Sequence, residues 1–136
     1  MIIPRKIAEM LFEHAIREAP IESCGYLAGT GERISKAYPM KNADGREDHF
    51  SFDPAEQFAV IKESRAEGLS IVGVYHSHPA TPARPSAEDI KLAYDSDILY
   101  IIVSLANGSR AVRGYRISGG RVDEETLIVE EDEYEQ

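Results

Sequence analysis

Two short apolar runs constrain the fold of this chain more than any other feature. Residues 71–75 and 98–105 are almost wholly hydrophobic, and polar, glycine or proline residues bound them. Runs of this length are typical of central strands that are buried on both faces of a sheet. Because such strands must be covered by helices, the two runs predict an α/β protein.

The segments around these runs alternate between helical and strand-like patterns. A helix is predicted over 4–18, where apolar residues recur on one face, and another over 53–67, which opens with an N-cap, a first-turn proline and a capping-box glutamate. A third helix begins after Ser86. Turns that contain glycine separate the other predicted strands, at 23–29, 32–38, 110–117 and 121–129. This order of elements predicts an α/β/α sandwich with a mixed sheet.

Length and composition fit one intracellular domain. The 136 residues have a mass of 15.1 kDa and are 43% hydrophobic, which is enough to bury one core. With a mean hydropathy of −0.33 and no apolar run near the ~20 residues of a membrane helix, we expect no transmembrane span. The N-terminus lacks the apolar core of a secretion signal, and the single cysteine, Cys24, excludes an intrachain disulfide and a thiolate-rich metal site. These features predict a location in the reducing cytoplasm.

The acidic charge of the chain is concentrated at its C-terminal end. The net charge is −9, and the last 14 residues hold eight of the 24 acids and no Lys or Arg. We therefore predict a domain over 1–129 and a solvated acidic tail over 130–136. Nucleic-acid binding is not expected, because phosphate contacts need clustered Lys and Arg.

Two histidines and an aspartate have the spacing of a metal site. His76 and His78 follow the first apolar run, and residues two apart in an extended chain point to the same side. Asp89 falls in the first turn of the third helix, where the proline-rich segment 79–85 can return it to the histidines. Two neutral imidazoles and a carboxylate suit zinc, and three ligands leave a fourth position for water, as in catalytic sites.

Each part of this pattern also has a simpler explanation. A His-x-His pair at a strand end is more often engaged in ordinary hydrogen bonds than in metal binding. Ser86 and Asp89 fit a capping box, which needs no chemistry. Glu22, farther upstream, is one acid among many. The residues taken singly leave these alternatives open.

In combination, the pattern resembles the signature of the JAMM metallopeptidases, also called MPN-plus domains. Glu22 is followed by His-Ser-His, seven residues, a serine, two residues and an aspartate. The segment 22–29 is similar to the family's segment around its catalytic glutamate, and 78–86 is similar to the small stand-alone bacterial and archaeal members. The resemblance extends from the first helix to the strand at 110–117. It implies an α/β/α fold similar to that of cytidine deaminases.

The resemblance implies a role for each residue of the pattern. His76, His78 and Asp89 would bind one zinc ion per chain. Glu22 would be the general base that takes a proton from the zinc-activated water and passes it to the leaving amine. Ser86 would hydrogen-bond the carbonyl oxygen as it becomes an oxyanion.

The activity implied is hydrolysis of the bond after the C-terminal Gly-Gly of a ubiquitin-like or sulfur-carrier protein. The alternatives are a non-catalytic scaffold that binds such a partner and a zinc nucleobase deaminase. The presence of all three ligands and of Glu22 favours catalysis over the scaffold. A single cysteine cannot supply the Pro-Cys-x-x-Cys pair of the deaminases. No long insertion follows Asp89, so we do not expect the loops that select a ubiquitin chain linkage.

Four other residues are expected to have structural roles. Cys24 lies close to Glu22, but a small buried strand residue is a better interpretation than a nucleophile. His49 belongs to the polar loop 41–52, where it is a surface residue or overhangs the cleft. His14 falls on the apolar face of the first helix, and Ser77 should point away from the metal because it alternates with the ligands.

Overall fold

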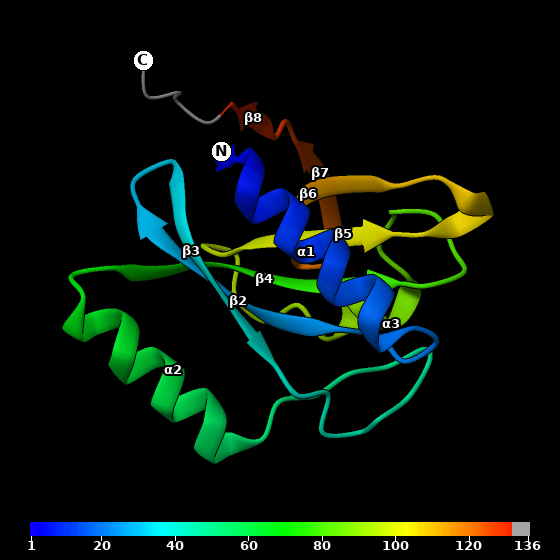
Figure 1. The fold of residues 1–136 in the computed structure, drawn as a ribbon, viewed down its shortest axis with the longest axis horizontal. Coiled ribbons are helices and arrows are strands. Elements are labelled where there is room, and N and C mark those ends of the chain that lie inside the picture. The colour runs from blue at the N-terminus through cyan, green and yellow to red at the C-terminus, as the bar shows by residue number, and fades with distance from the viewer. Residues whose placement is uncertain (132–136) are drawn as a thin grey trace.

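Eight strands of the computed structural model, which describes residues 1–131, form one mixed sheet (Figure 1). The elements in chain order are β1 (Ile2–Pro4), α1 (Arg5–Glu18), β2 (Cys24–Thr30), β3 (Arg33–Met40), α2 (Pro54–Ala66), β4 (Ser70–His78), α3 (Ala87–Lys91), β5 (Leu99–Ser104), a 3₁₀ turn (Ala106–Gly108), β6 (Ala111–Ser118), β7 (Arg121–Glu125) and β8 (Ile128–Glu130). Across the sheet the strands follow the order β7-β6-β5-β4-β2-β3-β1-β8. The central strand β4 is parallel to β5 and antiparallel to β2.

Helices cover both faces of this sheet. On one face α1 packs over the largest apolar cluster, which includes Leu27 and Tyr75. On the other face α2 packs over Tyr26 and Val74, while α3 packs over a separate cluster around Ile102. Adjacent residues of a strand point to opposite faces, which explains why Leu27 and Tyr26 enter different clusters. The predicted α/β/α sandwich with a mixed sheet is confirmed.

The sheet curls so that its two ends approach each other. Only two residues of the chain separate β7 from β8, although these strands stand at opposite ends of the strand order (Figure 1). The N-terminus closes the gap, because the Met1 amino group lies 3.1 Å from the Glu125 carboxylate and the Met1 carbonyl accepts from the Ile128 N–H. The predicted single strand at 121–129 is therefore wrong: the chain changes partner from β6 to β1 at 126–127.

The other predicted elements are observed close to their expected ends. The main difference is β4, which continues through His78 rather than ending at residue 75, so both histidines belong to the strand. A glycine-containing turn is found at 107–108, as expected between the strands at 98–105 and 110–117, and both Asn107 and Gly108 have positive φ angles, of 57° and 70°. The short strand β1 was not predicted from the sequence, because three residues carry too little pattern.

The acidic C-terminal end is described only in part. Glu130 belongs to β8 and bonds Arg33, and Glu131 bonds Arg5. Residues 132–136 of the predicted tail lie outside the described residues, so the division between domain and tail stays a prediction. Among residues 1–131, no helix has both the length and the apolar character needed to cross a bilayer.

Candidate metal centre

The pairing of β2 with β4 places three candidate residues on one face of the sheet. Cys24 is the register partner of His76, and the next residues along, Ser23 and Ser77, are joined by a backbone hydrogen bond of 3.0 Å. The same register continued by one residue sets Glu22 opposite His78. Residues that face each other across an antiparallel pair point to the same side of the sheet. Glu22, His76 and His78 therefore point to the side covered by α2 and α3.

Asp89 reaches the histidines because a capping box begins α3. The Ser86 hydroxyl accepts from the Asp89 N–H at 3.0 Å, and the Ser86 N–H donates to Asp89 Oδ2 at 2.9 Å. The same Oδ2 atom lies 3.1 Å from His78 Nε2 and 3.2 Å from His76 Nε2. The capping box and the metal site are thus compatible, because the cap is what aims the carboxylate at the histidines.

The three ligand atoms form a nearly equilateral triangle that fits zinc. The third side, between the two histidine Nε2 atoms, is 3.2 Å. Tetrahedral zinc, with ligands at about 2.0–2.1 Å, needs its ligand atoms about 3.3–3.4 Å apart. His78 Nδ1 donates to the Pro82 carbonyl oxygen at 2.8 Å, which orients the ring so that Nε2 is the nitrogen that faces the other two ligand atoms. This group of His76, His78 and Asp89 can hold a metal ion.

The charges in this cluster also suit a cation. Burial would raise the pKa of Asp89, but its hydrogen bonds with His76 and His78 outweigh burial and hold that pKa well below its usual range. Burial lowers the pKa of His78, and the hydrogen bonds with Asp89 and with the Pro82 carbonyl more than offset this, so the pKa is raised. An ionised carboxylate and two imidazoles therefore converge on one point.

Glu22 is a buried carboxyl group beside the metal ligands. Its side chain is 5% exposed, and its Oε1 atom has no hydrogen-bond partner among the described residues. Burial raises the pKa of Glu22 to about 8, against the opposing charge of His78. The backbone is held firmly, since the Glu22 carbonyl accepts from the Asn42 side chain at 3.0 Å and the Glu22 N–H donates to the Arg46 carbonyl. A group of this kind is suited to accept a proton near neutral pH.

Ser86 is exposed to solvent and caps α3 beside Asp89. Its hydroxyl oxygen accepts a hydrogen bond in the cap, so its proton is not used there. That proton can donate to another group while the cap stays intact.

A cavity of about 540 Å³ opens beside His76 and Asp89. Phe50 lies in its wall and stacks on the His76 ring, with 4.8 Å between the ring centroids and an angle of 23°. Aromatic and aliphatic side chains dominate the rest of the lining, among them Tyr26, Phe52, Val74, Leu92, Tyr94 and Tyr100. An apolar cavity that ends at a cluster of metal ligands is a typical substrate site.

The loop at 41–52 forms part of this cavity, and the sequence predicted a role there only for His49. His49 lines the cavity, where it lies 2.7 Å from Asp44 and bonds Glu88, so it overhangs the cleft. Asn42 organises the loop through its side chain, which accepts from the Asp44 N–H and donates to the His49 carbonyl. The sequence signal for this role is the pair of aromatic residues, Phe50 and Phe52, at the end of a largely polar segment.

Structural roles are found for Cys24, His14 and Ser77. Cys24 is fully buried, and burial raises the pKa of its thiol to about 12, so it is not an activated nucleophile. His14 is buried on α1, where its Nδ1 atom lies 2.7 Å from the Tyr75 hydroxyl. The Ser77 hydroxyl accepts from the Ser23 N–H and takes no part in the ligand cluster.

Comparison with known families agrees with this site. The family model for prokaryotic homologues of the JAB domain matches residues 4–116, which include every residue of the cluster. The chain belongs to this family.

Its relatives of similar length are peptidases. The CysO-cysteine peptidase of Mycobacterium tuberculosis is 37% identical over 134 residues, which cover 96% of this chain and 92% of the relative. The probable TtuB-protein conjugate cleaving protease of Thermus thermophilus is 34% identical, over 95% of this chain and 82% of the relative. This member of the prokaryotic JAB family is accordingly a hydrolase of the JAMM type.

Solved structures show the same fold. A protein of Desulfitobacterium hafniense superposes with a TM-score of 0.85 at 40% identity, over 97% of this chain and 94% of the other. A JAB1/MPN domain protein from Archaeoglobus fulgidus superposes with a TM-score of 0.66 at 23% identity, over 95% and 96% of the two chains. The second likeness shows the JAB1/MPN fold alone.

Proposed function

We propose that this chain is a zinc peptidase that hydrolyses the bond after the C-terminal Gly-Gly of a ubiquitin-like or sulfur-carrier protein. The observation that carries the proposal is the buried Glu22 carboxyl, whose Oε1 atom has no hydrogen-bond partner within residues 1–131, on the same sheet face as the triangle of His76, His78 and Asp89. Relatives named for cleavage of CysO-cysteine and of TtuB conjugates support this class of substrate. The single buried free cysteine fits the reducing cytoplasm in which we place the reaction.

The residues divide the work of hydrolysis as follows. His76, His78 and Asp89 would hold one zinc ion, which when bound supplies Lewis-acid activation of a water molecule and of the scissile carbonyl. Glu22 accepts the proton of the attacking water and returns it to the leaving amine. The outward hydroxyl proton of Ser86 donates to the carbonyl oxygen as negative charge develops, which is worth roughly 3–4 kcal/mol for one such donor.

The substrate segment is an extended C-terminal tail. The cavity of about 540 Å³ beside His76 supports this, because a space of that size suits a short stretch of chain better than a folded surface. Glycines before the scissile bond let the backbone approach the buried ligands, because they carry no side chain that would meet Phe50 or His49.

A direct test uses a carrier protein that ends in Gly-Gly followed by extra residues. Incubation with zinc-loaded protein should release the extension directly after the second glycine, as seen by mass spectrometry. A chelator should stop the release and added zinc should restore it. Ser86→Ala should slow cleavage by roughly 10²–10³-fold, whereas Ser109→Ala, at an exposed position outside the cavity, should not.

The scaffold hypothesis predicts a different outcome. A non-catalytic binding module would form a complex with the carrier protein but leave the tail of the carrier intact. Intact tails with zinc-loaded protein, across several carriers of the same genome, would favour the scaffold over the peptidase.

A further inference from the structure

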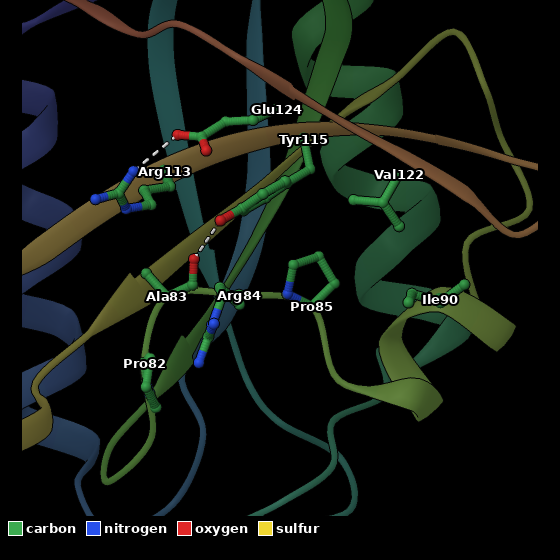
Figure 2. A pocket seen from close by; sticks show the side chains of 9 residues that line it. All are labelled: Pro82, Ala83, Arg84, Pro85, Ile90, Arg113, Tyr115, Val122 and Glu124. Atoms are coloured by element: carbon green, nitrogen blue, oxygen red, sulfur yellow. Dashed lines mark hydrogen bonds and ion pairs between the residues drawn. The ribbon is translucent and has the colours of Figure 1, made fainter.

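Three consecutive carbonyl groups of the proline-rich loop are held by side chains from three neighbouring strands. The Thr81 carbonyl accepts from the Ser104 hydroxyl of β5 at 2.6 Å, and the Pro82 carbonyl accepts from His78 of β4 at 2.8 Å. The Ala83 carbonyl accepts from the Tyr115 hydroxyl of β6 at 2.5 Å, a bond that Figure 2 shows between two residues that line a second cavity.

The loop depends on these bonds because it can supply few of its own. Pro79, Pro82 and Pro85 have no N–H, so three of the seven residues at 79–85 donate nothing. Ser104 makes a firm anchor, since its hydroxyl also accepts from the Ala106 N–H at 3.1 Å. Tyr115 is an equally fixed donor, because its ring is 5% exposed and packs in the cluster with Ala83.

This one loop sets the position of two metal ligands. Its Pro82 carbonyl accepts a hydrogen bond from His78 Nδ1, which fixes the ring and turns Nε2 toward the ligand cluster. Its C-terminal end leads into the Ser86 cap that aims Asp89 at the same Nε2 atom. A shift of the loop would therefore move the carbonyl that orients one ligand and the helix that carries another.

We propose that Tyr115 and Ser104 are positioning residues for the metal centre, which act on His78 and Asp89 through the carbonyls at 81–83. This inference rests on the proposed zinc site, and it adds residues that touch neither metal nor substrate. Groups that bond a metal ligand directly, as the Pro82 carbonyl bonds His78, typically change metal affinity by 10–100-fold. Tyr115 and Ser104 act one step farther from the metal, so we expect effects at the lower end of this range.

The test uses substitutions that remove only the hydroxyl group and keep the rest of the side chain. Tyr115→Phe and Ser104→Ala should each weaken zinc binding by roughly 10-fold in a competition assay with a chromophoric chelator. Both should also change the visible absorption bands of the cobalt-substituted protein, which report ligand geometry. The matched control is Tyr38→Phe, because the Tyr38 hydroxyl is buried on β3 without a hydrogen-bond partner among the described residues.

The readouts separate positioning from a purely structural role. If the hydroxyls were only structural anchors, their removal would lower the melting temperature of the metal-free protein. Zinc affinity would stay within twofold of the parent, and the cobalt spectrum would be unchanged. That result would overturn the proposal. If the parent protein itself binds no zinc, the proposed function fails instead. Zinc binding by the parent with no effect of either hydroxyl refutes only the positioning role.

Discussion

The two faces of strand β4 show how one short segment serves both stability and chemistry. On the α1 face, Tyr75 is fully buried in the largest apolar cluster, and its hydroxyl bonds His14. On the opposite face, His76 and His78 meet Asp89 in a gap between two smaller apolar clusters. Adjacent residues of one strand thus lie in different environments, because alternate side chains point to opposite sides.

The difference lies in how buried polar groups are satisfied. On the α1 face the His14 and Tyr75 side chains satisfy each other. On the site face two titratable groups, the carboxyl oxygen of Glu22 and Nδ1 of His76, are buried without partners among the described residues, whereas on the α1 side of β2 the buried group without a partner is the neutral Ser23 hydroxyl. Unsatisfied buried groups cost stability, and two titratable ones beside the cluster of His76, His78 and Asp89 indicate a surface shaped for a ligand. We expect changes on the site face to affect zinc and turnover, and changes on the α1 face to affect folding alone.

Removal of a metal ligand should have the largest effect. His76→Ala and Asp89→Ala should each lose the bound zinc and all detectable cleavage, since two ligands hold the ion poorly. Metal analysis of the purified variants checks this expectation. The control is His14→Ala, which removes a buried histidine from the α1 face and should keep one zinc per chain. Full zinc content in both site variants would show that the ligands are wrongly assigned.

Substitution of Glu22 should separate chemistry from metal binding. Glu22→Gln keeps the size of the side chain but removes the proton acceptor, so we expect turnover to fall by about 10²–10⁴-fold with zinc content unchanged. Steady-state cleavage of the extended carrier, with metal analysis of the same sample, gives the answer. Glu13→Gln on the exposed side of α1 is the matched control. Normal turnover in Glu22→Gln would remove Glu22 from the mechanism.

The sequence predicts those features that depend on local pattern. Capping residues and apolar periodicity are enough to locate α1 and α2, and the buried strands stand out as apolar runs. The spacing of the histidines also predicts their common face, because alternation along a strand is a local property. The position of Asp89 in the first turn of α3 is also predictable, because the capping box with Ser86 is a local pattern.

What the sequence does not predict depends on contacts between distant segments. Strands β1 and β8 are three residues each, and they exist because the N-terminus pairs with residues 128–130. The bonds from Ser104 and Tyr115 to the proline-rich loop join segments more than 20 residues apart. No local pattern distinguishes these hydroxyls from others on a strand, so only the folded chain shows what they hold.

The pKa of Glu22 predicts a pH-dependent stability in the metal-free protein. Burial raises this pKa to about 8, above its value in the unfolded chain, so the unfolded state releases the proton first as the pH rises. The burial penalty is absent below about pH 4 and grows up to about pH 8. Relative to the parent, zinc-free Glu22→Gln should therefore gain roughly 2–4 kcal/mol between pH 4 and pH 8. Urea unfolding in a chelator measures this gain, and a stability difference that does not vary with pH would contradict it.

The smallest expected effect lies on the α1 face of β4. Tyr75→Phe removes the hydroxyl that bonds His14 Nδ1 at 2.7 Å but keeps the ring, which packs closely over Gly25. We expect a loss of about 1–2 kcal/mol in the free energy of unfolding, because a buried imidazole nitrogen is left without a partner. Zinc content and cleavage rate should match the parent, since the neighbouring His76 points to the other face. A change in zinc affinity with Tyr75→Phe would show that the two faces are coupled through the strand. Stability on one face of β4 and chemistry on the other would then not be independent.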